Sequence, residues 1–470
     1  MNIVKSIYAF IWIILFSLTS SWSQSKDAEW EVQHQAIEDL LAFYHQGEQI
    51  PAIAVAVIKD GELKQEYLIG KTQLENGAPI SSQSLFQLGS LSKLFTGILA
   101  RTFQESGQID FQKPITFYLA ESLSASAIEK LQKVLVKDVL QHRAGFPNHG
   151  PSTPPTPNGI AMRGGYSKAL LIKDLEQLEL PENPQENFSY SNFGYGVMAL
   201  IMETVSGQSY ESLLQEYLTQ VYQMPGTTSE ETGLNQQQLV RPYFIGKRDR
   251  PTQAWQMGYE KAAGGIFSSL QNLSQLMIQQ SAVYQQEDQD HPLFMNQTQA
   301  PMPPIRNQFY GIGFIQSISR PDSTIVKYMH GGDLDGFASQ YVFYPKEKLG
   351  YIILTSSGGP WINELDAVIE KVLLNVPLRE MVPLERRLLK RFAGKYRFNS
   401  GTEIKIEASG DKLHCHFKGA DPIRIYPASE TKVFFRSMDV QIELDLDAKG
   451  KTKGLIYYQG TEPHSAKKIK

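Results

Sequence analysis

The chain has 470 residues, more than one compact core normally holds, which favours two or three structural units. Hydrophobic residues make up 41% and charged residues 20%, a composition that describes a soluble globular chain and excludes an intrinsically disordered one. The formal net charge of −4 at pH 7 gives no reason to expect nucleic acid as a partner.

The N-terminus carries the pattern of an export signal. Lys5 precedes an apolar run over residues 7–18, and serines follow up to Ser23, which predicts a signal peptide over residues 1–23. The run is shorter than the about 20 residues of a membrane-spanning helix, so no stable span is expected after cleavage, and an uncleaved anchor is the alternative. We therefore expect a periplasmic or secreted protein. The lone Cys415 cannot form an internal disulfide.

After the signal, strand patterns flank a helical stretch. Residues 51–70 read as two β-rich runs joined at Asp60-Gly61, which predicts a hairpin. Residues 105–300 are mostly helical in pattern and include a Pro-rich loop over residues 150–159. Alternating strands return over residues 325–355 with short links that favour antiparallel neighbours. The order predicts one sheet closed by both ends of this region, with a helical subdomain between them.

From about residue 385 the pattern changes to short alternating strands with closely spaced turns, which predicts a small β-barrel or sandwich. Residues 381–470 hold 18 Lys and Arg against 11 Asp and Glu, so this tail carries about +7 and the remainder about −11. We interpret the tail as a solvated basic surface. The alternative is contact with an anionic surface such as cell wall or lipopolysaccharide.

One serine stands out as a candidate nucleophile. The pattern S-x-x-K occurs five times, but only Ser90–Lys93 opens an apolar-periodic helix. The i to i+3 spacing places both side chains on one helix face, and the Ser90 N–H belongs to the unsatisfied donors of a helix start. A base within reach and a donor for an oxyanion are what a serine nucleophile needs. The alternative is an ordinary helix start.

Two further motifs follow in the chain. Tyr190-Ser191-Asn192 is the only Y-x-N, and the alternative for Tyr190 is a buried core tyrosine. His330-Gly331-Gly332 closes a strand pattern, where two glycines let the backbone approach a ligand and aim an N–H at it.

The order S-x-x-K, Y-x-N, H-x-G resembles the serine β-lactamase and penicillin-binding protein superfamily. Within it the chain is similar, over roughly residues 30–375, to the class C β-lactamase-related serine hydrolases, which include DD-peptidases, D-aminopeptidases and esterases. "DVLQHRAGFP", "KAAGGIFSSLQNLSQLM", "YGIGF" and "VFYPKEKLGYIILTS" also carry the resemblance. It implies an α+β fold, with a β-lactamase-like antiparallel sheet flanked by helices and a helical subdomain over residues 27–380. The tail over residues 385–470 resembles a lipocalin-like, barrel-like all-β domain.

The resemblance also implies roles. Ser90 would be the acyl-accepting nucleophile and Lys93 its base or proton relay, provided that burial or nearby positive charge lowers the lysine pKa from about 10.4. Tyr190 would be a second base, helped towards phenolate by Lys93 and a cation at position 330. The expected substrate-binding groups are the Asn192 amide, the His330-Gly331-Gly332 strand, and the N–H groups of Ser90 and Asp333 as an oxyanion hole.

The chain departs from class C β-lactamases at His330, where those enzymes usually carry the lysine of K-T-G. A histidine loses its charge near pH 6.5, which disfavours antibiotic resistance as the native role and favours a peptidase or esterase. The alternative is that His330 is structural, as we expect for His142. His414 and His416 flank Cys415 but should point outward from an alternating strand, so no metal site is expected there.

The sequence therefore predicts an exported serine hydrolase that cleaves an amide or ester through an acyl-Ser90 intermediate. Its substrate would be a small ester, a D-amino-acid peptide or a peptidoglycan-derived fragment. No metal or organic cofactor is expected. The alternative is a catalytically silent peptidoglycan- or peptide-binding protein that keeps the fold.

Overall fold

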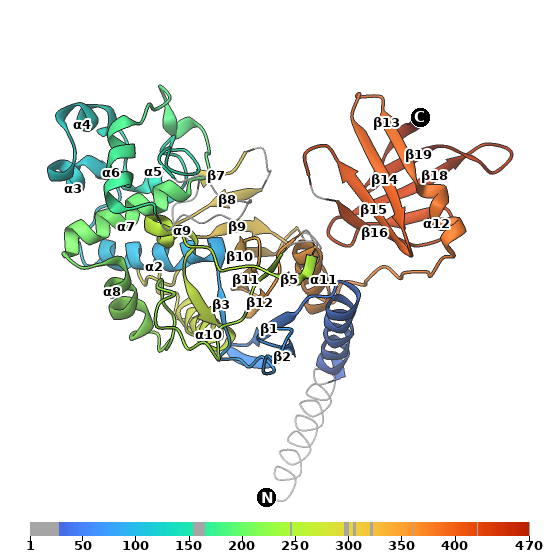
Figure 1. Ribbon diagram of the computed structural model, residues 1–470, viewed down its shortest axis with the longest axis horizontal. Helices are drawn as coiled ribbons and strands as arrows, with labels where there is room; N and C mark the ends of the chain where they lie inside the picture. Colours follow the sequence, from blue (N-terminus) through green and yellow to red (C-terminus); the bar gives the residue numbers. More distant parts are fainter. Residues whose placement is uncertain are drawn as a thin grey trace, which may run out of the picture. The chain divides into compact units, whose positions relative to one another are not determined.

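The computed structural model (Figure 1) describes residues 28–153, 165–244, 247–295, 300–303, 307–319, 323–359, 361–420 and 422–469. The predicted signal peptide lies outside these residues, as does most of the predicted Pro-rich loop. The chain divides into two compact units, Glu48–Ile362 and the combination of Met1–Gly47 with Asn363–Lys470. In the described parts of the chain, we find no helix with the length and apolarity that crossing a membrane requires.

The larger unit is built on an eight-stranded sheet with the order β2-β1-β12-β11-β10-β9-β8-β7. These strands are β1 (Ala52–Lys59), β2 (Glu62–Gly70), β7 (Ala300–Pro301), β8 (Gln308–Tyr310), β9 (Ile315–Ile318), β10 (Val326–Asp333), β11 (Ala338–Tyr344) and β12 (Leu349–Thr355). β1 pairs antiparallel with β12, from Ile53 opposite Thr355 to Lys59 opposite Leu349. The predicted closure of one antiparallel sheet by both ends of the region is confirmed. The predicted hairpin is also confirmed, with Asp60 and Gly61 at positive φ between β1 and β2.

Helices are the main regular structure of the chain between β2 and β7. They are η1 (Gly89–Leu91), α2 (Ser92–Glu105), α3 (Ile115–Leu119), η2 (Ala120–Ser122), α4 (Ala125–Leu131), α5 (Val136–Leu140), α6 (Lys168–Gln177), η4 (Pro184–Glu186), α7 (Asn192–Ser206), α8 (Tyr210–Leu214), η5 (Gln215–Thr219), η6 (Gly258–Glu260), α9 (Lys261–Gly264) and α10 (Leu270–Gln285). Two short sheets, β3 (Leu85–Gln87) with β6 (Phe267–Ser269) and β4 (Tyr243–Phe244) with β5 (Lys247–Pro251), lie among them. α10 packs on β1 and β12 (Figure 1).

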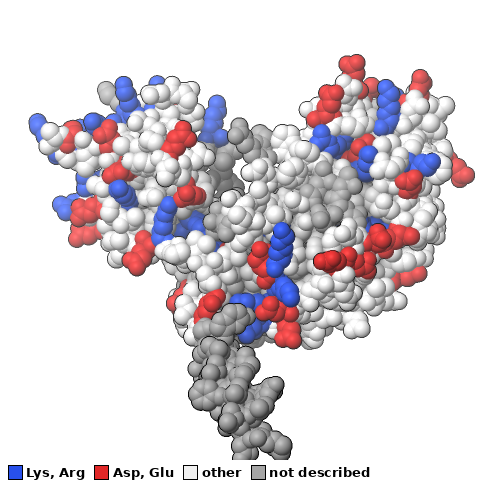
Figure 2. All heavy atoms as spheres, turned by 180° about the vertical axis from the view of Figure 1, so that it is seen from behind, with Lys and Arg blue, Asp and Glu red and all other residues white. Residues whose placement is uncertain are grey.

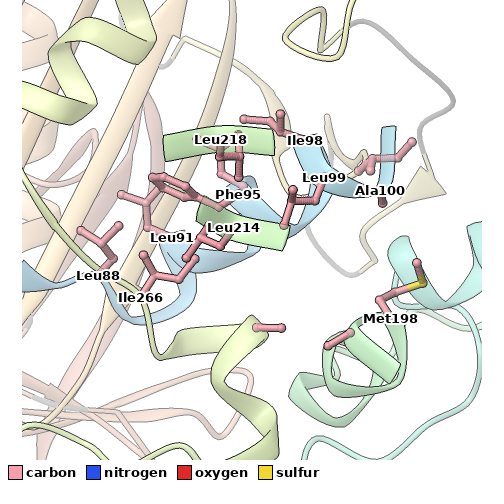
Figure 3. Close-up of a cluster of buried hydrophobic side chains, with 14 of the residues drawn as sticks. Leu88, Leu91, Phe95, Ile98, Leu99, Ala100, Met198, Leu214, Leu218 and Ile266 are labelled. Carbon is pink, nitrogen blue, oxygen red and sulfur yellow. The ribbon is translucent and has the colours of Figure 1, made fainter. Parts of the chain in front are cut away.

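Helix α2 runs through the middle of the larger core. Leu91, Phe95 and Leu99 are fully buried. Figure 3 shows them beside Leu214 of α8 and Leu218 of η5. An apolar helix buried on nearly all sides has little freedom to shift, because interiors are packed at close to crystal density. The core therefore fixes the turn η1, which carries Ser90, at the start of this helix.

The smaller unit contains a closed eight-stranded barrel, so the predicted small β domain is a barrel and not a sandwich. Its strands are β13 (Gly394–Phe398), β14 (Glu403–Ser409), β15 (Lys412–Phe417), β16 (Ile423–Pro427), β17 (Lys432–Phe434), β18 (Val440–Leu446), β19 (Thr452–Gln459) and β20 (Glu462–Ile469). α11 (Trp361–Leu373), α12 (Arg386–Phe392) and a helix over residues 28–47 complete the helical elements described here. On β15, Cys415 is buried while His414 and His416 are partly exposed, as the alternation predicts.

A buried carboxylate ties this smaller unit together. Glu364 of α11 is 3% exposed and accepts hydrogen bonds from the hydroxyls of Tyr44 and, at 2.5 Å, Tyr426. The guanidinium of Arg436 lies 4.2 Å from the centre of the Tyr426 ring and 3.9 Å from a Glu364 oxygen. Burial raises the pKa of Glu364, and the two hydroxyl donors and Arg436 oppose that rise. The network joins the helix over residues 28–47, α11 and the barrel.

Candidate active site

The predicted motifs S-x-x-K and H-G-G lie side by side because two glycines permit a close backbone approach. A Cβ placed on Gly332 would lie 1.9 Å from the Leu88 oxygen and 2.9 Å from the Ser90 nitrogen, so any side chain there would collide with η1. Gly89 has φ +56°, and a Cβ on it would lie 3.3 Å from the Asp333 nitrogen. The end of β10 therefore runs against the turn that carries Ser90.

Lys93 is a fully buried amine with three oxygen neighbours. Its Nζ lies 2.6 Å from Asn192 Oδ1, 2.8 Å from the Ala263 carbonyl oxygen and 3.3 Å from Ser90 Oγ. Lys93 is 0% exposed, and this desolvation holds its pKa well below the usual range, with partial opposition from the negative charge of Glu260. The predicted condition for a lysine base, a lowered pKa, is met by burial.

Tyr190 covers the other side of the amine. The Lys93 Nζ lies 4.7 Å from the centre of the Tyr190 ring and 5.5 Å from that of Tyr195. Burial raises the pKa of Tyr190, and a hydrogen bond with Ser90 opposes the rise. The Tyr190 hydroxyl is therefore a protonated phenol at neutral pH, in contact with the candidate nucleophile, and is not the phenolate that we expected.

The expectation of a cation at position 330 is wrong. His330 is 4% exposed, and its Nδ1 lies 2.7 Å from the Gly331 carbonyl oxygen while its Nε2 lies 2.9 Å from the Tyr310 hydroxyl. A carbonyl oxygen only accepts, so Nδ1 carries a hydrogen, while the Tyr310 hydroxyl can either donate to Nε2 or accept from it. Burial and the charge of Lys93 lower the pKa of His330 to about 3. The alternative interpretation, a structural histidine, fits these contacts.

Asn192 begins α7 with its amide held in one orientation. Ser191 caps the helix through the Gly194 N–H, at 2.8 Å. The Asn192 Nδ2 donates to Asn148 Oδ1 at 2.9 Å and faces His149 Nε2 at 3.4 Å. With both amide hydrogens directed to these acceptors, Oδ1 faces Lys93.

Sequence reasoning missed three residues of this site: His149, Glu260 and Ala263. His149 Nδ1 donates to Glu260 Oε2 at 2.8 Å, and the Gly150 N–H donates to the other carboxylate oxygen at 3.2 Å. Glu260 is 0% exposed. The carboxylate thus fixes the tautomer of His149 that presents a lone pair to Asn192. His149 lies two residues after "DVLQHRAGFP", and Glu260 directly precedes "KAAGGIFSSLQNLSQLM". This closeness to segments that carry the resemblance is the one signal that could have found them.

His142 is also buried, and its Nδ1 accepts the N–H of Ser191 at 3.1 Å, a structural role in line with the expectation for this residue. Over the described residues, no three His, Cys, Asp or Glu side chains gather as a metal site would need. The expectation that no cofactor is used stays a prediction.

Comparison with known proteins gives this geometry a family. Residues 35–372 match the family described as Beta-lactamase, and residues 378–468 match a domain of unknown function, DUF3471. Penicillin-binding protein 4* of Bacillus subtilis is 20% identical over 88% of this chain and 94% of its own length. A β-lactamase of Providencia stuartii is 24% identical over 72% of this chain and 91% of its own.

Solved structures agree in fold. The octameric penicillin-binding protein homologue from Pyrococcus abyssi superposes with a TM-score of 0.64 at 19% identity, covering 92% of this chain and 99% of that one. The class C β-lactamase from Rhodobacter sphaeroides gives a TM-score of 0.59 at 19% identity over 73% of this chain and 99% of that one. With its three motifs meeting around one buried lysine, the chain belongs to the β-lactamase family of serine hydrolases and is homologous to penicillin-binding proteins and class C β-lactamases.

Proposed function

We propose that this chain is an exported serine hydrolase that cleaves an amide or ester through an acyl-Ser90 intermediate. The observation that carries the proposal is the placement of Lys93 Nζ, buried and 3.3 Å from Ser90 Oγ. A buried amine with a lowered pKa is what a general base at neutral pH requires. Export is supported by the charged and apolar pattern of residues 1–23.

The neighbours of Lys93 fix the direction of its lone pair. A neutral amine has two hydrogens and one lone pair, and two acceptors, Asn192 Oδ1 and the Ala263 oxygen, lie within 2.8 Å. The hydrogens occupy these acceptors, so the lone pair faces the Ser90 hydroxyl. As Ser90 Oγ bonds to the substrate carbonyl carbon, its proton moves to Lys93.

Tyr190 then supplies a proton to the leaving group. Its phenol, kept protonated by burial and hydrogen-bonded to Ser90, donates to the departing amine or alcohol and recovers a proton from Lys93. Water hydrolyses the acyl-enzyme by the reverse sequence, which restores Ser90. The N–H groups of Ser90 and Asp333 are our proposed oxyanion hole, and losing one such donor typically costs about 10²–10³ in rate.

The neutral His330 bears on the substrate. A lysine at this position would offer a permanent charge to a substrate carboxylate, and the buried imidazole offers none. We therefore favour a small ester or a D-amino-acid peptide, including a peptidoglycan-derived one, over β-lactam antibiotics as the native substrate.

Active-site labelling tests the proposal. A fluorophosphonate and a fluorescent penicillin should label the wild-type protein and fail to label Ser90→Ala, and hydrolysis of p-nitrophenyl esters should fall by about 10³-fold or more. Ser409→Ala is the matched control, because Ser409–Lys412 has the same S-x-x-K spacing in the barrel. Labelling that survives in Ser90→Ala would show another nucleophile. A wild-type protein with no turnover above background would instead support the silent binding protein.

A further inference from the structure

The barrel of the smaller unit opens at one end into a cavity of about 570 Å³, within the range of about 300–1,000 Å³ of small-molecule sites. Its walls come from the ends of β13, β15 and β19 and the starts of β14 and β20, which meet at the same mouth. The lining residues are Phe398, Asn399, Ser400, Thr402, Ile404, Phe417, Tyr457, Gln459, Pro463, His464 and Ser465.

The floor of this cavity is aromatic. An eight-stranded barrel is just wide enough for side chains to fill, and Tyr396, Ile406 and Cys415 fill its interior. Above this core, Phe398, Phe417 and Tyr457 are only partly buried. The rings of Phe398 and Tyr457 meet edge to face with centres 5.8 Å apart. A concave aromatic surface left partly open to water is a site at which a ligand would gain binding energy.

The rim is polar, and its one titratable side chain is His464 of β20. Its exposed polar members, which offer amides and hydroxyls, are Asn399, Ser400, Thr402, Gln459 and Ser465. About one residue in three over 381–470 is Lys, Arg, Asp or Glu, yet none of the lining residues is. Figure 2 shows charges of both signs spread over the outside of this barrel, on the left of that view. The cavity is therefore set apart from the rest of the barrel surface by its lack of Lys, Arg, Asp and Glu.

We propose that the mouth of the barrel binds a neutral carbohydrate. A sugar ring presents one apolar C–H face, which matches the aromatic floor, and a rim of hydroxyl or acetamido groups, which matches the amides and hydroxyls above it. A fatty acid fits less well, because its hydrocarbon chain would leave the amides and hydroxyls of the rim without partners. The site lies in the unit that does not contain Ser90, so it is a function additional to the hydrolysis.

Calorimetric titration of the full chain tests this site with three probes: chitotriose, maltotriose and sodium decanoate. We expect saturable binding of at least one sugar with a Kd of about 1 mM or below, and the same Kd in Ser90→Ala, because the active site takes no part. No saturation by either sugar up to ten times that concentration, or binding of decanoate alone, would overturn the proposal. A sugar Kd that depends on Ser90 would place the sugar at the active site and likewise overturn it.

Two variants locate the ligand. Asn399→Ala combined with Gln459→Ala removes two exposed rim amides and should weaken sugar binding at least tenfold without affecting the fold. Phe417→Leu keeps an apolar side chain but removes a ring, and should also weaken sugar binding. Ser409→Ala, at the end of β14 opposite to the cavity, is the control and should bind as the wild type does. Equal sugar affinity in all of these proteins would show that the sugar binds elsewhere.

Discussion

Each of the two units buries a titratable side chain among aromatic rings, but the groups in contact with that side chain differ. Glu364 of the smaller unit is contacted by two hydroxyl donors and lies near a guanidinium. Lys93 of the larger unit contacts only uncharged oxygens, and two aromatic rings cover it. The first group is compensated and holds the unit together. The second is left without a contacting counter-charge, and its lowered pKa suits the base that we propose, so the surroundings separate a structural role from a proposed chemical one.

The largest effect on activity is expected for Lys93→Met. We expect kcat/KM for esters to fall by about 10³-fold or more, because no other buried amine faces Ser90 in the parts of the chain that the structure describes. The same change should alter the free energy of unfolding by no more than about 1–2 kcal/mol, because relief of the buried amine is offset by the loss of its hydrogen bonds to Asn192 and Ala263. Steady-state kinetics and thermal unfolding measure the two effects. Near-normal activity, or a large loss of stability, would contradict the assigned role.

Glu364→Ala should lower stability and leave Ser90 reactive. Removing the carboxylate leaves Tyr44, Tyr426 and Arg436 buried without their acceptor, which we expect to cost about 3–5 kcal/mol of stability. Fluorophosphonate labelling of Ser90 should persist at temperatures where the variant is folded. Glu364→Gln, which keeps an acceptor of the same shape, is the control and should cost less. Equal stability of Glu364→Ala and the wild type would show that the network is not structural.

His149→Ala tests whether His149 orients the Asn192 amide that contacts Lys93. Without its acceptor, Asn192 has one fewer contact fixing its orientation, and we expect kcat to fall by about 10- to 10²-fold with a smaller change in KM. His149→Gln can still accept a hydrogen bond and should recover part of the loss. An effect on KM alone, or no recovery in His149→Gln, would show that His149 contacts substrate and does not position Asn192.

The pH dependence of activity and stability tests the lowered pKa of Lys93. Lys93 is a base only when deprotonated, so kcat/KM should rise with pH through a midpoint well below 10.4. Stability should also rise with pH from the folded-state pKa of Lys93 up to its unfolded value, because in that window the unfolded chain binds one more proton. Lys93→Met should lose this slope. A fall in stability over the same window would contradict the sign.

The smallest effect is expected at His330. Because His330 is neutral throughout the working range, with a pKa of about 3, it contributes no titration near pH 6.5. His330→Gln should therefore leave the shape of the pH–rate profile unchanged and lower activity only modestly through its contact with Tyr310. A limb near pH 6.5 that disappears in this variant would restore the charged histidine that the structure contradicts. The wild-type profile alone cannot assign such a limb, because coupled titration of Lys93 and Tyr190 could also produce one. A limb that persists in His330→Gln belongs to that pair and not to His330.

The meeting of the three motifs could be predicted from sequence because each is local and its order is characteristic of a family. The contacts that set protonation could not. Glu260 lies 111 residues from His149, and no pattern in either segment shows that they touch. The neutral state of His330 depends on its burial and on Lys93, which lies on helix α2 far away in the sequence. The choice between barrel and sandwich depended on the pairing of β13 with β20, which alternation alone does not show.

The pairing of β1 with β12 has a consequence for biosynthesis. β1 reads Ala-Ile-Ala-Val-Ala-Val-Ile, buried along its length, and one of its two neighbours is about 300 residues further along the chain. In a nascent polypeptide, β1 is therefore an apolar, aggregation-prone strand with one edge unpaired until the ribosome has passed residue 355. Fragments that stop before β12 should accumulate as insoluble material, and a chaperone that shields this strand during translation would raise the yield of the whole protein.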